Sequence, residues 1–124
     1  MAPQTASHAA IELASFRERV IGIDGAMLAT ADGLCVASVA LSVQPESMAA
    51  LGAASLGVAW RIAAEGGIEG LQEVRVHGNT GFISVHPVGP NTLMVVIGDN
   101  GTDRFALQRE LPQTLARLAS LLER

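Results

Sequence analysis

Few residues of this 124-residue chain have the types and spacing that enzyme chemistry needs. In the stretch LATADGLCVAS, Asp32 and Cys35 could supply a carboxylate beside a thiol nucleophile. A catalytic thiolate needs a basic neighbour, however, and none is close in sequence, so we interpret Cys35 as a small thiol in an apolar strand. An Asp-Gly pair between two apolar runs is typical of a tight type I′ hairpin turn. We therefore expect a turn at Asp32 and Gly33, and no catalyst.

Other kinds of active or metal-binding site are excluded or poorly supported. The chain contains no lysine, which excludes a P-loop and Schiff-base chemistry. The patterns G-x-S-x-G and G-x-G-x-x-G do not occur. His8, His77 and His86 are not spaced with cysteines or carboxylates in the way that metal ligands usually are. We therefore expect no catalytic residue, no metal and no cofactor.

The composition restricts the partners and the compartment. Hydrophobic residues make up 49% of the chain and the net charge is −4. All eight basic residues are arginines without a cluster that could follow a phosphate backbone, so we expect no nucleic-acid partner. The start has no basic region before an apolar stretch, and no apolar run reaches the roughly 18 residues of a membrane span. We expect a cytoplasmic protein without membrane insertion, formed by one domain over residues 1–124, with residues 1–6 as a disordered tail.

Apolar periodicity and turn residues predict three helices and five strands. The helices are expected over residues 6–20, 46–65 and 103–123, and Pro112 should kink the last one or restart it. The strands are expected over residues 26–30, 34–40, 71–78, 81–88 and 92–98. Strands 26–30 and 92–98 are apolar on both faces, so they should pair at the centre of the sheet. This predicts an α/β (α+β) fold with a five-stranded antiparallel sheet, strand order 2-1-5-4-3, and helices on both faces.

The helix over residues 46–65 is apolar on all sides, because only Arg61 is charged between Met48 and Ala64. One stripe can lie on the sheet: Met48, Leu51, Val58 and Ile62. The roughly opposite stripe would then face water: Ala49, Ala53, Leu56 and Trp60. Gly52 is a further small residue of this expected interface. Leaving that side exposed would forgo several kcal/mol, and its small residues would allow close approach of a second helix. We expect these five residues to form a homodimer interface, unless the last helix or a loop covers them.

The strand over residues 71–78 carries its polar residues on one face. Glu73, Arg75 and His77 alternate along it, as a strand at the margin of a sheet would allow. Its outer edge is open to a partner. We include these three residues in the expected interface.

Three stretches carry a family resemblance: GIDGAMLATADGLCVAS, ESMAALGAASLGVA and GFISVHPVGPNTLMVVIGDN. Together they resemble the roadblock family, which is named for dynein light chains and includes bacterial partners of small Ras-like GTPases. The resemblance implies one long helix on one face of the sheet and both terminal helices on the other. It also implies dimerisation through residues 46–65 and 71–78. Third strands paired across a dyad near Arg75 would set Glu73 opposite His77 of a second copy.

By this resemblance, the protein is a noncatalytic homodimeric adaptor for a small Ras-like GTPase or a related signalling complex, with or without an effect on GTP hydrolysis. No arginine can be named as an activating finger. A small-ligand sensor and a purely structural assembly subunit remain alternatives. The crowded alanine and leucine residues on both faces of the sheet argue against a large pocket between the layers.

Overall fold

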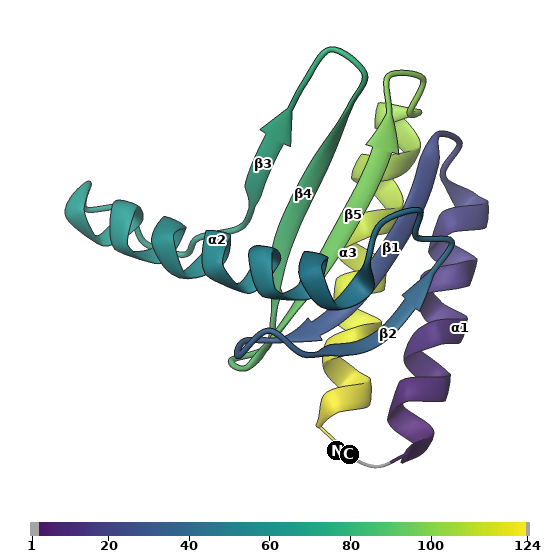
Figure 1. Ribbon diagram of the computed structural model, residues 1–124, viewed down its shortest axis with the longest axis horizontal. Coiled ribbons are helices and arrows are strands. Elements are labelled where there is room, and N and C mark those ends of the chain that lie inside the picture. The colour runs from purple at the N-terminus through teal and green to yellow at the C-terminus, as the bar shows by residue number, and fades with distance from the viewer. Residues whose placement is uncertain (1–2, 124) are drawn as a thin grey trace.

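The computed structural model describes residues 3–123, and its sheet has the predicted topology (Figure 1). The strand order is β2-β1-β5-β4-β3 and every neighbouring pair is antiparallel. The strands are β1 (Ile23–Thr30), β2 (Cys35–Val39), β3 (Val74–His77), β4 (Gly81–Val88) and β5 (Thr92–Asp99). The predicted fold class is therefore confirmed.

The two central strands are covered on both faces, as their sequences indicate. Met27 of β1 lies opposite Val95 of β5, and both are fully buried on the α2 side of the sheet. Leu28 and Met94 form the next pair and face the other way, into the core under the terminal helices. The sheet therefore separates two apolar layers.

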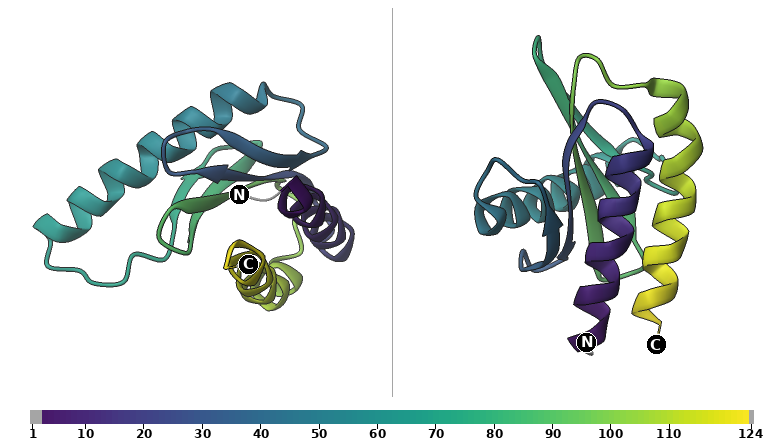
Figure 2. Two further views of the ribbon diagram at one scale, coloured as in Figure 1. Left: turned by 90° about the horizontal axis from the view of Figure 1, so that it is seen from below. Right: turned by 90° about the vertical axis from the view of Figure 1, so that its right-hand side faces the viewer.

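Helix α2 (Pro45–Glu65) crosses one face of the sheet, and α1 (Pro3–Arg19) and α3 (Arg104–Leu122) cover the other (Figure 2). The predicted stripe of α1 is fully buried: Ala9, Leu13, Phe16 and Val20. The carboxylate of Asp103 accepts hydrogen bonds from the backbone amides of Phe105 and Ala106, both at 3.1 Å, which caps α3.

Two expectations about the terminal helices are corrected. Helix α1 begins at Pro3, so residues 3–6 are helical and are not a tail, while residues 1–2 lie outside the described residues. Helix α3 continues through Pro112 and does not restart there. Pro112 is exposed, and so is Gln108, whose carbonyl loses its usual amide donor. Water can therefore satisfy that carbonyl, and the helix persists.

The turn between β1 and β2 is a hairpin, but its type differs from the prediction. Gly33 has a φ of +90°, while Ala31 and Asp32 keep negative φ, so the turn cannot be type I′. The amide of Gly33 donates to the carbonyl of Thr30 at 3.0 Å, and the amide of Thr30 donates to the carbonyl of Leu34 at 2.8 Å. This is a type I turn followed by a left-handed glycine. The Asp32 carboxylate accepts a hydrogen bond from the Thr30 hydroxyl, which is a structural role.

Candidate interaction surface

The stripe of α2 that we expected to face a partner faces the sheet instead. Ala49, Gly52 and Leu56 are buried against the sheet, so their assignment to an outer interface is wrong. Side-chain size explains the choice of face. A Cβ atom at Gly52 would lie 3.2 Å from Cγ2 of Val95, so the helix axis lies as close to the sheet as a glycine allows. The small residues give close helix–sheet packing, and the larger apolar side chains are left outside.

The outer face of α2 carries an apolar stripe that the molecule does not cover. Leu51, Val58 and Ile62 are 62%, 57% and 66% exposed, and their spacing of seven and four residues places them along one line of the helix. We call these three residues the outer stripe. The periodicity of the sequence identified Leu51, Val58 and Ile62 as members of one stripe. We expected that stripe to face the sheet, and this orientation is wrong.

Two other predicted interface residues of α2 lie on its flank. Ala53 is partly buried against the core beneath the helix, and Trp60 is 47% exposed. Beside Trp60 is a hollow of about 240 Å³, which Gly57 and Pro90 also line. A half-exposed tryptophan next to a hollow is typical of an interface anchor.

The C-terminal end of α2 extends past the outermost strand of the sheet, as both views show (Figures 1 and 2). Next to this overhang lies β3, whose Val76 is on the same side of the sheet as α2 and is exposed. Within residues 3–123, β3 pairs only with β4, so its outer edge has free backbone groups. The overhanging helix and the open strand edge together form a corner that a second molecule can fill.

The polar residues of the β3 segment face the terminal helices. Arg75 lies opposite Ser84, and His77 lies exposed opposite Phe82. Nε of Arg75 is 3.0 Å from Oε2 of Glu73, and its guanidinium lies 5.1 Å from the centre of the Phe82 ring. Both members of the ion pair are partly exposed, so the pair contributes little to stability. Glu73 precedes β3 and is engaged within its own chain, and its contact with His77 of a second copy stays a prediction.

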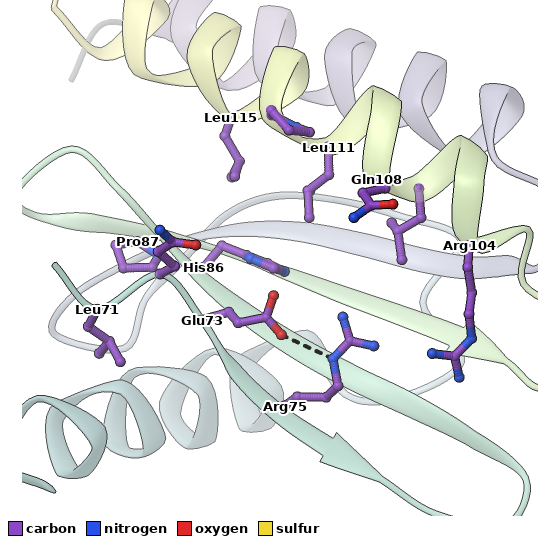
Figure 3. Close-up of a pocket in the computed structure, with 12 residues that line it drawn as sticks. Leu71, Glu73, Arg75, His86, Pro87, Arg104, Gln108, Leu111 and Leu115 are labelled. Atoms are coloured by element: carbon purple, nitrogen blue, oxygen red, sulfur yellow. Dashed lines mark hydrogen bonds and ion pairs between the residues drawn. The ribbon is translucent and has the colours of Figure 1, made fainter. Parts of the chain in front are cut away.

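A groove of about 710 Å³ opens between α3 and the β3–β4 pair (Figure 3). It is larger than we expected from the crowded alanine and leucine residues of the two layers. His86 lines its floor and is only 2% exposed, with Nε2 2.8 Å from the hydroxyl of Ser84. Burial lowers the pKa of His86, and the nearby Glu73 carboxylate opposes this shift. The sequence signal was the alternation of Ser84 and His86 on an otherwise apolar strand face.

The comparisons with known proteins agree with this geometry. The model of the Roadblock/LC7 domain matches residues 10–98, which include α2, strands β1 to β4 and all of β5 except its last residue, Asp99. The chain belongs to the Roadblock/LC7 family. No curated protein matches this roadblock domain.

Solved structures of roadblock proteins share the fold of this chain. A Roadblock/LC7 domain from Streptomyces avermitilis has a TM-score of 0.87 at 20% identity, covering 93% of this chain and 98% of that one. The gliding protein MglB from Thermus thermophilus has a TM-score of 0.86 at 19% identity, covering 99% and 94%. An MglB structure with a tetrameric arrangement has a TM-score of 0.89 at 17% identity, covering 99% and 93%. At these identities, the likeness concerns the fold.

The buried His86 should make the stability of this roadblock domain depend on pH. Because its pKa in the folded protein lies below the ordinary value of 6.5, the unfolded chain binds the proton first as the pH falls. The contribution of neutral His86 to the free energy of unfolding is therefore complete above about pH 6.5. It is lost as the pH falls toward the pKa of His86 in the folded protein. We expect the free energy of unfolding, measured by urea denaturation, to decrease from pH 7 to pH 5.

Two glutamine variants test this assignment. His86→Gln should flatten the decrease, whereas His77→Gln, at an exposed position of the neighbouring strand, should retain it. Equal pH profiles for the two variants would contradict the role of His86. All samples need one protein concentration, because self-association changes apparent stability.

The remaining candidate for reactive chemistry in this roadblock domain is Cys35. Burial raises the pKa of its thiol, and the Ser38 hydrogen bond opposes this shift. A thiol with a raised pKa is protonated at neutral pH, which disfavours nucleophilic chemistry. Among residues 3–123, no three His, Cys, Asp or Glu side chains lie close enough together to hold a metal ion.

One helix among the described residues is long and apolar enough to cross a membrane by length and composition, and that helix is α2. The mean hydropathy of its most apolar 18 residues is 1.3, so the expectation that no such run exists is wrong. In this roadblock domain, however, α2 lies on the sheet through Ala49, Gly52 and Leu56. The apolar character of this buried side is therefore explained by packing on the sheet.

Proposed function

We propose that this roadblock domain is a noncatalytic, cytoplasmic homodimeric adaptor that binds a small Ras-like GTPase or a related signalling complex. The observation that carries the proposal is the outer stripe of α2 above an open β3 edge. Burial of a Val, Leu or Ile side chain stabilises by about 1.5 to 3 kcal/mol, so a second copy that covers both elements would gain several kcal/mol. The tetrameric arrangement of one structural neighbour supports self-association.

In the proposed dimer, the second copy covers the outer stripe and the GTPase contacts the flank of α2 at Trp60. This division follows from the angular positions on the helix. Leu51, Val58 and Ile62 share one line, whereas Trp60 lies on another side, near the hollow beside Pro90. The membership of bacterial GTPase partners in the roadblock family, which the sequence resemblance implied, supports a GTPase as the occupant.

Co-purification from the native cell, followed by binding measurements with the recovered protein, tests the GTPase assignment. We expect the tagged dimer to recover a small GTPase. Trp60→Ala should weaken its binding about 30-fold, since anchor residues of this kind contribute about 2 kcal/mol or more. Phe105→Ala is the matched control, because Phe105 is an exposed aromatic residue at the start of α3, on the opposite layer.

The outcomes distinguish a wrong partner from a wrong binding surface. If no GTPase is recovered, the proposed partner is wrong. If one is recovered and both variants bind it equally, the flank of α2 is not its binding surface. Each variant should keep the oligomeric state of the unmodified protein.

A small-ligand sensor is the second candidate function, and the groove of about 710 Å³ favours it. This volume lies within the range of small-molecule sites. Thermal stabilisation by a metabolite, in the absence of any GTPase contact, would favour this candidate over the adaptor.

A further inference from the structure

The groove between α3 and β3 has two walls of different chemistry. The α3 wall presents residues three or four positions apart, which therefore share one face: Arg104, Leu107, Leu111 and Leu115. The opposite wall carries Glu73 and Arg75. In Figure 3, Arg75 and Arg104 lie toward one end of the groove, while Leu115 and Leu71 lie toward the other. The groove is thus polar at one end and apolar at the other.

The charge of the groove is opposite in sign to that of the whole chain. Arg75, Arg104 and Glu73 are its charged lining residues besides the buried His86, whose lowered pKa keeps it neutral at pH 7. Two arginines against one glutamate leave a net charge of +1, whereas the chain carries −4. Glu73 pairs with Arg75, and no ion pair of Arg104 is found within residues 3–123. The guanidinium of Arg104 is therefore available to an acidic group from outside.

The shape of the groove suits an extended occupant better than a small molecule. From Arg104 to Leu115 the α3 wall spans eleven residue steps, or about 16 Å at the rise of an α-helix. Small-molecule sites usually enclose about 70–90% of the ligand surface. Here Arg75, Arg104, Gln108 and Pro112 are all exposed, so the groove lies open along its length.

We propose that this groove binds an amphipathic acidic helix of a partner protein. Its apolar side lies on Leu111 and Leu115, which are partly buried on the α3 wall, and its carboxylates bind Arg104 and Arg75. The groove lies on the α3 side of the sheet, whereas the proposed GTPase surface at Trp60 lies on α2, across the sheet, and Pro87 borders both hollows (Figure 2). An apolar helix face with anchors every three or four residues is a common form of peptide recognition.

Selection from a phage-displayed library of 20-residue peptides on the full-length protein tests the proposal. We expect enriched peptides with Leu, Ile or Phe at spacings of three and four residues and with Asp or Glu at one end. Arg104→Gln should weaken their binding about tenfold or more, because a hydrogen bond to a charged group contributes about 1.5 to 3 kcal/mol. Arg75→Gln should weaken binding in the same direction.

Arg109→Gln is the matched control, since Arg109 is an exposed arginine of α3 that does not line the groove. Unchanged thermal midpoints show that the variants fold. The proposal is overturned if no peptide is enriched, if the peptides lack acidic residues, or if Arg104→Gln and Arg109→Gln bind them equally. It is also overturned if dodecanoate or citrate binds at Arg104 more tightly than any peptide, which would indicate a small-anion site. GTPase binding at Trp60 should not change with Arg104→Gln, so the two proposals fail separately.

Discussion

Val58→Glu combined with Ile62→Glu is expected to give a monomer of about 12.8 kDa at concentrations at which we expect the unmodified protein to form the proposed dimer. Both side chains belong to the exposed outer stripe, so neither substitution removes a buried contact within the chain. In the dimer, each would place a carboxylate in an apolar interface and remove burial of about 1.5 to 3 kcal/mol. We expect the dimer dissociation constant to rise at least about 100-fold. Sedimentation equilibrium over a micromolar concentration range measures it.

Ile11→Glu is the control for this prediction. Ile11 is an exposed isoleucine of α1, on the opposite layer, and its substitution should leave the dimer intact. Leu56→Glu would not serve, because Leu56 is buried against the sheet and its substitution damages the core. An unmodified protein that sediments as a monomer at micromolar concentration would refute the homodimer. If the double variant and Ile11→Glu form assemblies of equal mass, the outer stripe is not the dimer interface.

Gly22→Ala is expected to cause the largest loss of stability among single small substitutions. Gly22 has a φ of +95°, which side chains rarely adopt, and an added Cβ would lie 2.4 Å from the Cα of Thr102. That neighbour is backbone in the segment between β5 and α3, where the hydroxyl of Thr102 donates to the carbonyl of Gly22 at 3.1 Å. Relief of the clash must separate these segments. We expect a loss of about 3 to 5 kcal/mol in the free energy of unfolding, measured by urea denaturation.

Gly57→Ala is the matched control at a helical position with open space. Apart from its two chain neighbours and the backbone of its own helix, no atom lies within 4 Å of a Cβ built on Gly57, and alanine favours a helix over glycine by about 0.5 to 1 kcal/mol. This variant should therefore gain stability. If Gly22→Ala lowers the free energy of unfolding no more than Gly57→Ala changes it, Gly22 does not pack closely on Thr102.

Much of the fold could be predicted from sequence because burial leaves a local pattern. Strands β1 and β5 are apolar on both faces, and only the centre of a two-faced sheet buries such strands, so their pairing and the order 2-1-5-4-3 followed. The stripe of α1 was predicted for the same reason. Helix α3 was located by its leucines, but its continuity through Pro112 depends on the exposure of Gln108 and Pro112, which a local pattern does not contain.

For the interaction surface, the sequence predicted which elements take part but not how they are arranged. The overhang of α2 beyond β3 and the separation of α3 from β3 arise from the placement of whole elements on the sheet. The groove, with Arg75 and Arg104 on opposite walls and His86 on its floor, joins residues that are distant in the chain. Periodicity within one element could not bring them together.

The sequence alone determined that α2 has more apolar surface than one sheet face can cover, because only Arg61 is charged between Met48 and Ala64. Which side faces the sheet was decided by tertiary packing. Small residues at Ala49 and Gly52 let the helix approach Val95, and this close contact leaves Leu51, Val58 and Ile62 outside. Hydrophobicity is similar around the whole helix and cannot distinguish its sides. Side-chain volume can, but only once the opposing surface is in place.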